Sequence, residues 1–215
     1  MKGLVATRTA LTLIGTGFVV AASPWARRRC VTWGATPDEV TGALPGDGLL
    51  PDAGLVSTRA VTIDAGPGVV WPWLVQMGSG RGGAYTYDWI ENLFGLNMHS
   101  ADEILPQFQH LTVGDTLPLG PQGPAMRVEI CEPERTLAFR SSDGAWVWIF
   151  ELRPELTATR LISRNRISPP AKSRVGRLLY EAVMAPGSLI MERRMLHGIK
   201  DRAERIGRSA QAGTP

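Results

Sequence analysis

The chain has 215 residues, of which 44% are hydrophobic and 20% are charged, and its formal net charge is +3. This composition is that of an ordinary globular protein, and this length fits one domain with extensions. The basic residues are spread along the chain without a contiguous stretch interleaved with aromatic residues, so nucleic acid is not an expected partner.

The first 26 residues form an apolar segment. No charged side chain occurs in residues 9–26, and extension back to Gly3 gives over 20 residues interrupted only by Arg8. An α-helix needs about 20 mostly apolar residues to cross a bilayer. We interpret residues 1–26 as a single N-terminal anchor in the cell membrane; a cleaved signal peptide or a soluble helix packed on the domain are the alternatives. The arginines at 27–29 favour a cytoplasmic domain after such an anchor, with export as the alternative.

Residues 27–54 are predicted to form a linker that lies against the domain as a strap. Thr36 is a favourable N-cap and Pro37 fits the first helical position, which together indicate one short helix. Residues 44–52 are rich in proline and glycine and are predicted to be extended. One short helix and an extended strap are therefore expected to lie against the domain.

The main domain is predicted over residues 55–207. A β-branched run at residues 55–63 indicates a strand, and a Gly-Pro-Gly turn then switches the chain to a helix over residues 67–77, kinked at Pro72. The glycine-rich loop of residues 78–83 follows. Phosphate-binding loops follow a strand and open a helix, whereas this loop follows a helix. We therefore predict a mobile lid or a tight connection at the mouth of a cavity.

The rest of the domain is predicted to be strands and one long helix. A second helix is predicted over residues 87–94, and Asp143-Gly144 is a strong hairpin signal. The last helical region is predicted over residues 173–207 with a break at Pro186-Gly187, and residues 208–215 are predicted to be a flexible tail. Strands are predicted at residues 116–119, 125–132, 136–140, 145–153 and 159–167, with a short helix or loop at 99–111.

The turn Ile63-Asp-Ala-Gly-Pro-Gly-Val-Val-Trp71 and the order of the elements resemble the START/Bet v 1-like superfamily, which includes polyketide cyclases and lipid-transfer proteins. The resemblance covers residues 55–206, and residues 80–92, 164–166 and 191–195 are similar to a bacterial branch of it. It implies an α+β helix-grip fold. In that fold a curved antiparallel β-sheet wraps around a long C-terminal helix and encloses a cavity; here an N-terminal apolar helix precedes it.

Aromatic residues with polar tips follow the glycine-rich loop. Tyr85, Tyr87 and Trp89 suit the mouth of a pocket that holds a largely apolar ligand. A packed helix with exposed acidic residues is the alternative interpretation. Tyr85 and Trp89 can share a face only if this helix begins before Tyr87.

Two neighbouring strands carry the other candidate site residues. Trp146 and Trp148 alternate along one strand, so both lie on one face of the sheet, which is predicted to be core and cavity wall at once. On the next strand Arg164 and Arg166 alternate with Asn165. A solvated arginine face is the expected arrangement, and it leaves Asn165 to hydrogen-bond a ligand. The alternative places the arginines inside, bound to a carboxylate or phosphate.

The long helix is predicted to present one face formed by Met191, Met195, Ile199, Ala203 and Ile206. Met191 and Met195 suit an adaptable pocket wall because methionine is unbranched and flexible. Glu192 and the two arginines that follow it are predicted to form a solvated face with a salt bridge.

Candidates for metal binding and catalysis are few. Cys30 and Cys131 have neither a disulfide-scaffold nor a metal spacing, so two unpaired thiols in a reducing compartment are expected. No Gly-x-Ser-x-Gly nucleophile turn is present, and His99 with Asp102 is a candidate acid-base pair. The spacing of the remaining cluster matches no metal site, so neither a metal nor another cofactor is expected; its members are His99, Asp102, Glu103 and His110.

The preferred hypothesis is binding of a hydrophobic small molecule or lipid in the internal cavity, in transport or sequestration at the membrane. One alternative is a cyclase or dehydratase in which residues such as His99 and Asp102, Arg81 or Tyr87 move protons. Another is a partner-binding domain of a membrane assembly, which predicts an exposed apolar patch. The resemblance and the patterns together select ten ligand-binding candidates: Arg81, Tyr85, Tyr87, Trp89, His99, Trp146, Trp148, Asn165, Met191 and Met195.

Overall fold

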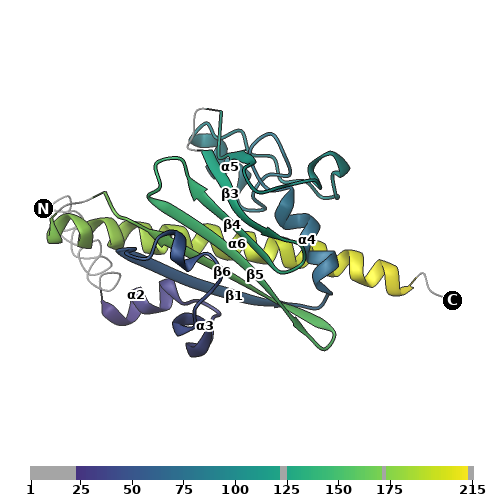
Figure 1. Cartoon of the computed structure of the whole chain (residues 1–215), viewed down its shortest axis with the longest axis horizontal. Helices are drawn as coiled ribbons and strands as arrows, with labels where there is room; N and C mark the ends of the chain where they lie inside the picture. The colour runs from purple at the N-terminus through teal and green to yellow at the C-terminus, as the bar shows by residue number, and fades with distance from the viewer. Residues whose placement is uncertain (1–22, 122–124, 171–172, 213–215) are drawn as a thin grey trace, which may run out of the picture.

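The computed structural model describes residues 23–121, 125–170 and 173–212. Within these residues a curved antiparallel sheet packs on a long C-terminal helix (Figure 1). This arrangement confirms the predicted α+β helix-grip fold. From one edge of the sheet to the other, the strands lie in the order β1 (Leu55–Ile63), β6 (Ala158–Ile167), β5 (Trp146–Glu155), β4 (Thr136–Ser141), β3 (Ala125–Glu132) and β2 (Thr116–Pro118).

The helices are short except for the last one. Pro72 lies inside α4, as predicted, and the helix following the glycine-rich loop begins at Asp88. The bounds are α2 Pro24–Val31, α3 Pro37–Thr41, α4 Pro67–Val75, α5 Asp88–Leu93 and α6 Arg174–Ala212, with single 3-10 turns η1 at Asp47–Leu49 and η2 at Pro106–Phe108.

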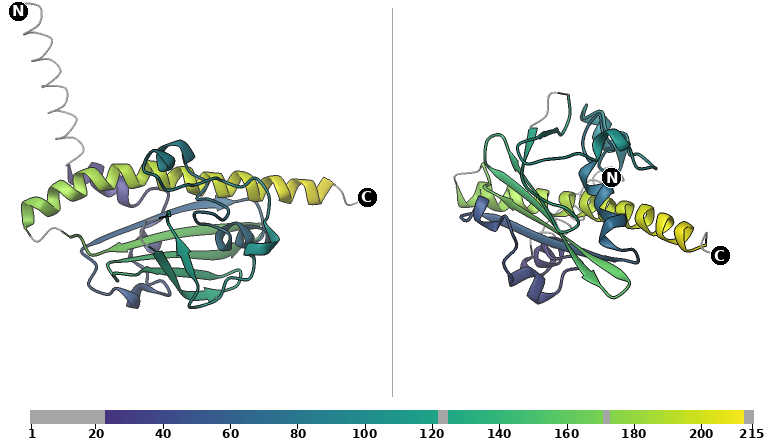
Figure 2. Two further views of the ribbon diagram at one scale, coloured as in Figure 1. Left: turned by 90° about the horizontal axis from the view of Figure 1, so that it is seen from above. Right: turned by 45° about the vertical axis from the view of Figure 1, so that its right-hand side comes forward.

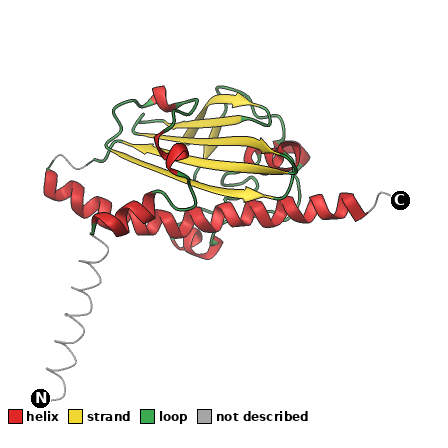
Figure 3. Ribbon diagram, turned by 90° about the horizontal axis from the view of Figure 1, so that it is seen from below, coloured by secondary structure: helices red, strands yellow, loops and turns green. Residues whose placement is uncertain are grey.

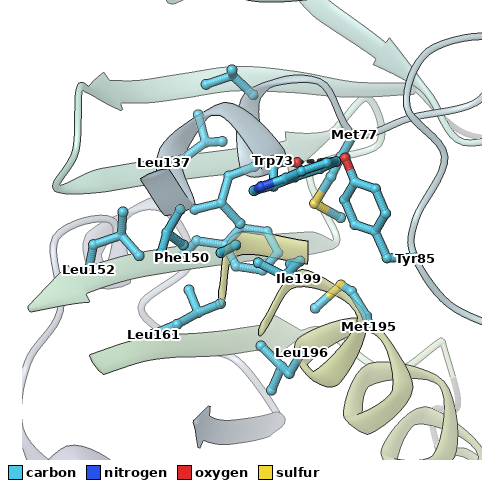
Figure 4. Packing of buried hydrophobic residues seen from close by; sticks show 14 of the residues in the cluster. Trp73, Met77, Tyr85, Leu137, Phe150, Leu152, Leu161, Met195, Leu196 and Ile199 are labelled. Carbon is cyan, nitrogen blue, oxygen red and sulfur yellow. Dashed lines mark hydrogen bonds between the residues drawn. The ribbon is translucent and has the colours of Figure 1, made fainter. Parts of the chain in front are cut away.

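The sheet is covered on both faces. Phe150 and Leu152 of β5 point to the inner face, where they pack with α4 and α6 in the main core (Figure 4). Val147 and Ile149 alternate with them and pack on the outer face with Leu44. The predicted two-residue alternation of β5 is confirmed. Burial of both faces explains why this strand carries almost no polar residue before Glu151.

The outer face is covered by residues 33–51, which are the part of the predicted 27–54 strap that packs on the sheet. From here on, the strap means residues 33–51. Its helix α3 begins as predicted, with a reciprocal capping box: the Thr36 amide donates to Glu39 Oε2 at 2.7 Å, and the Glu39 amide donates to Thr36 Oγ1 at 3.2 Å. This arrangement satisfies two amides that the first turn of a helix leaves unpaired.

Three arginines of β6 hold the strap. Arg164 Nη1 donates to Asp47 Oδ2 at 2.6 Å, Arg166 Nη1 donates to Asp47 Oδ1 at 3.3 Å, and Arg160 Nε donates to Glu39 Oε1 at 2.8 Å. Arg164 is only 2% exposed. The prediction of a solvated arginine face is therefore wrong, because the strap brings carboxylates and carbonyls over these side chains. The arginines bind carboxylates, but those of their own chain.

The helix α6 runs along the inner face and continues past the sheet (Figures 2 and 3). The predicted break at Pro186-Gly187 is wrong, since the helix is continuous through both residues. Ala185 is buried, and Ser188 accepts a hydrogen bond from Arg59 of β1 at 2.9 Å. These tertiary contacts on both sides of Pro186 hold the helix together despite the missing backbone donor.

The predicted anchor covers residues 1–26, of which residues 1–22 lie outside the described part of the chain. The remainder belongs to the start of α2. In the ranges that the structure describes, no helix combines the length and the apolar character needed to cross a bilayer.

Candidate functional site

A small cavity of about 30 Å³ lies between the inner face of the sheet and the loops that follow α4. Its wall is apolar and contains two aromatic rings, Phe139 from β4 and Trp148 from β5. The lining residues are Met77, Gly78, Ala84, Met98, Leu117, Leu119, Met126, Phe139 and Trp148.

Two half-buried tryptophans continue from the cavity wall along β5. The Trp146 and Trp148 rings stack at 5.6 Å with an interplanar angle of 21°. Trp148 Nε1 donates to Ser163 Oγ at 2.9 Å, and Trp146 Nε1 donates to Asn165 Oδ1 at 2.8 Å. Because both indole N–H groups already have partners on β6, the ring faces are what these residues can offer to a ligand.

Beneath the tryptophans lies a buried polar network centred on Glu192. Ser163 Oγ donates to Glu192 Oε1 at 2.6 Å and Asn165 Nδ2 donates to Glu192 Oε2 at 3.1 Å. Arg59 of β1 completes the network with an ion pair to the same carboxylate. Burial raises the pKa of Glu192, while the Arg59 charge opposes this shift. The prediction of a solvated Glu192 is wrong, since the side chain is 7% exposed.

Arg59 was not among the candidates that the sequence suggested. Its spacing from Ile63 could have indicated its position, because residues that are two or four apart in one strand share a face of the sheet. Ile63 is fully buried on the inner side, so Arg59 points inward as well. Its partner on α6 is 133 residues away, and no local pattern identifies it.

The glycine-rich loop is a tight connection. Gly78 and Gly83 form a bridge, and the amides of residues 78, 79 and 81–83 all donate to carbonyl oxygens of the chain. Arg81 reaches back to α4: its Nε donates to Met77 O at 3.1 Å and its Nη2 donates to Val75 O at 2.9 Å. The loop amides that a phosphate would need are thus already used.

Tyr85 is a core residue with a positive φ of 57°. Its hydroxyl donates to Trp73 O at 3.0 Å, and the two rings meet edge to face, as Figure 4 shows. Burial raises the pKa of the Tyr85 hydroxyl. The guanidinium of Arg202 lies 4.9 Å from the centre of its ring. This residue fixes the loop to α4 and α6.

The other candidates after the loop lie at the surface. Tyr87 and Trp89 are 36% and 70% exposed, and His99 is exposed as well. Asp102 is exposed and pairs with Arg202 at 2.9 Å. None of these side chains lines the cavity described above. The helix begins after Tyr87, so the condition for a shared face of Tyr85 and Trp89 is not met.

The methionines of α6 lie beside the core. Met195 is buried among the residues of the inner face, and Met191 is half-buried one turn earlier. The structure therefore brings together Trp146, Trp148 and Asn165 of the predicted set. Ligand binding by the ten candidates stays a prediction.

No family model and no curated protein matches the chain. Solved structures do match. The polyketide cyclase-like protein Cgl2372 from Corynebacterium glutamicum is 14% identical, with 67% of this chain and 88% of that chain covered and a TM-score of 0.42. The protein CV1439 from Chromobacterium violaceum is 11% identical, with 70% and 98% covered and a TM-score of 0.46.

The Aha1 dimer from Colwellia psychrerythraea is 14% identical, with 70% of this chain and 96% of that chain covered and a TM-score of 0.42. At these identities and TM-scores the matches carry no argument about ligand or activity. The helix-grip architecture rests on the chain's own sheet order and long C-terminal helix. These features confirm the helix-grip fold that the resemblance implied.

Proposed function

We propose that the chain binds an apolar small molecule in the cavity between the sheet and the loops after α4. The observation that carries this proposal is the composition of the wall: it contains no charged side chain, and Phe139 and Trp148 contribute aromatic rings. Such a wall suits a flat or flexible hydrocarbon and offers no counter-ion to a charged one.

The size of the cavity sets a condition on this function. Ligand pockets usually have about 300 Å³ or more, whereas this cavity has about 30 Å³, enough for a few water molecules. A ligand therefore has to displace part of the wall. Met77, Met98 and Met126 line it, and methionine changes rotamer at low cost. We propose that these three side chains move apart when the ligand enters.

This condition can be tested directly by methyl NMR. The full chain, with isotope-labelled methionine methyl groups, is placed in lipid nanodiscs. Addition of naphthalene or decanol is expected to shift the signals of Met77, Met98 and Met126. Met184, which is exposed on α6, is the internal control. Unchanged signals of all three cavity methionines at saturating ligand reject the proposal.

A matched pair of variants assigns the effect to the cavity. Ala84→Leu adds bulk at the cavity wall and is expected to abolish the shifts. Ala158→Leu makes the same change at the half-exposed start of β6, outside the lining residues, and is expected to leave them intact. Trp148→Ala removes the larger of the two aromatic rings in the wall. It is expected to weaken ligand binding more than it lowers the free energy of unfolding.

We also propose that the protein acts at a membrane. This part of the proposal is supported by the uncharged sequence of residues 9–26 alone. No observation in the described residues favours the cyclase alternative. The residues named for proton transfer do not line the cavity, and Asp102 is already paired with Arg202.

A further inference from the structure

The side of the molecule that faces away from the sheet is formed by α6 with α2 on one flank and α5 on the other. The two views of Figure 2 and the view of Figure 3 agree on this arrangement. We call this side the helical face. The described chain begins on it, at Ser23 just before α2.

The helical face exposes large apolar side chains. On α5, Trp89, Leu93 and its C-cap Phe94 are 70%, 77% and 75% exposed. They point outward because the helix is fixed from its other side. There Glu91 is buried. The exposed Asn92 also holds the helix to the following loop, since its Nδ2 donates to Met98 O at 2.9 Å.

Apolar exposure continues across the face. Ile190 on α6 is 56% exposed, and Trp25 on α2 is 69% exposed. A single exposed hydrophobic residue needs no explanation, but a group of them on adjoining elements indicates a binding surface.

The same face carries positive charge. Arg28 and Arg29 of α2 and Arg193 and Arg194 of α6 are exposed there. Asp201 is the exposed acid on the outward stripe of α6 near them. Asp102, which pairs with Arg202 of α6, is exposed in a loop. The other exposed carboxylates of the described residues lie on the strap, on loops and on strand ends and turns: Asp38, Asp52, Asp64, Glu103, Asp115, Glu132, Glu134, Asp143 and Glu155.

We propose that the helical face lies against an anionic lipid bilayer. Tryptophan and leucine beside arginine are the residues that bind in the interface between headgroups and acyl chains. The arginines would pair with anionic headgroups, which attract basic side chains near the bilayer surface. Ser23 lies on the helical face. If the residues before it form a bilayer anchor, that anchor would hold the helical face next to the bilayer. This inference is independent of ligand binding in the cavity.

The test reports which face meets the lipid, since the apolar N-terminal sequence alone can bring the chain to vesicles. In the full chain with Cys30→Ser and Cys131→Ser, an environment-sensitive fluorophore is attached at Phe94→Cys or at Leu156→Cys. Leu156 is fully exposed at the turn between β5 and β6. With phosphatidylcholine vesicles containing phosphatidylglycerol, the emission at position 94 is expected to shift to the blue and that at position 156 to remain unchanged.

Two charge variants test the role of the arginines. Arg193→Glu with Arg194→Glu is expected to remove the dependence of the shift on phosphatidylglycerol. Arg135→Glu with Arg153→Glu makes the same charge change at two exposed positions, one in the turn before β4 and one on β5, and is expected to retain the dependence.

Two outcomes overturn the inference. One is a fluorophore at position 94 whose emission shows no blue shift with phosphatidylcholine vesicles, whether or not they contain phosphatidylglycerol. The other is a blue shift without vesicles that grows with protein concentration, which would assign the face to a second copy of the chain.

Discussion

Arg59 on β1 and Glu192 on α6 form an ion pair that is almost fully removed from solvent, with the two side chains 0% and 7% exposed. The pair also organises its neighbours. Arg59 Nη2 donates to Ser188 Oγ at 2.9 Å, and Arg59 Nε donates to Cys30 O at 3.0 Å. One guanidinium thus joins the edge strand, the long helix and α2.

Removal of one partner of this pair is expected to destabilise the fold strongly. Arg59→Met leaves the Glu192 carboxylate buried without its counter-charge, which costs about 3–5 kcal/mol of unfolding free energy. Arg59→Met combined with Glu192→Met removes both charges and is expected to recover most of that loss. Urea unfolding of the full chain measures both values.

An exposed pair serves as the control for this cycle. Arg135 and Glu132 lie 4.0 Å apart with side chains 76% and 51% exposed. Arg135→Met is expected to change the unfolding free energy by less than about 1 kcal/mol. A double variant at the buried site no more stable than Arg59→Met alone would contradict the account given for the pair.

Two glycines of α6 are expected to respond in opposite directions to the same substitution. A Cβ on Gly198 would lie 2.5 Å from Tyr85 O, so Gly198→Ala is expected to cost about 1–3 kcal/mol despite the better helix propensity of alanine. Gly187 has no atom within 4 Å of that position, so Gly187→Ala is expected to gain up to about 1 kcal/mol. Equal effects of the two substitutions in denaturant unfolding would show that the contact with Tyr85 is not tight.

The contact of the strap with the sheet is expected to weaken in acid. Burial alone would raise the pKa of Glu39, but the hydrogen bond and charge of Arg160 and the Thr36 backbone bond outweigh it and lower the pKa. A carboxyl group whose folded-state pKa is lowered stabilises the fold above its ordinary pKa. That contribution is lost as the pH falls below about 4.5 toward the folded-state value.

The measurement is the unfolding free energy against pH for the wild type and Glu39→Gln. The variant is expected to show a flatter acid limb, because it lacks this titration. Parallel curves for the two proteins below pH 5 would contradict the assignment.

Replacement of Arg164 by lysine is expected to destabilise the fold. The Arg164 guanidinium donates to Thr58 Oγ1, Asp47 Oδ2 and the Glu39 carbonyl, in three directions that one ammonium group does not reach together. Arg164→Lys is expected to cost about 2–4 kcal/mol and to expose the strap to protease. Arg153→Lys, at an exposed site, is the matched control; equal protease cleavage rates in both variants would argue against this role.

Much of the fold could be predicted from the sequence because each strand keeps its own alternation. Residues 55–63 and 125–132 form strands with the predicted bounds. The N-cap at Thr36 is equally local, since its partner Glu39 is three residues away. Patterns of this kind depend on neighbours in sequence, and tertiary contacts reinforce them here.

The errors share one physical cause, which is a partner far away in the chain. Glu192 is followed by two arginines and resembles a solvated helix face, but its counter-charge comes from β1. Arg164 lies in an alternating arginine pattern, but its partners are more than 100 residues away. The size of the cavity could not be predicted either, because it depends on how side chains from separate elements fill one volume.

The strap has a consequence for where this folding unit begins. The sheet and its grip helix together start at Leu55, yet the arginines of β6 find their carboxylates at Glu39 and Asp47. A fragment cut at Leu55 would uncover Val147 and Ile149 and leave three guanidinium groups without counter-ions. We therefore expect the smallest fragment that folds by itself to retain the strap, since residues 33–51 cover the outer face of the sheet as an integral layer of the domain.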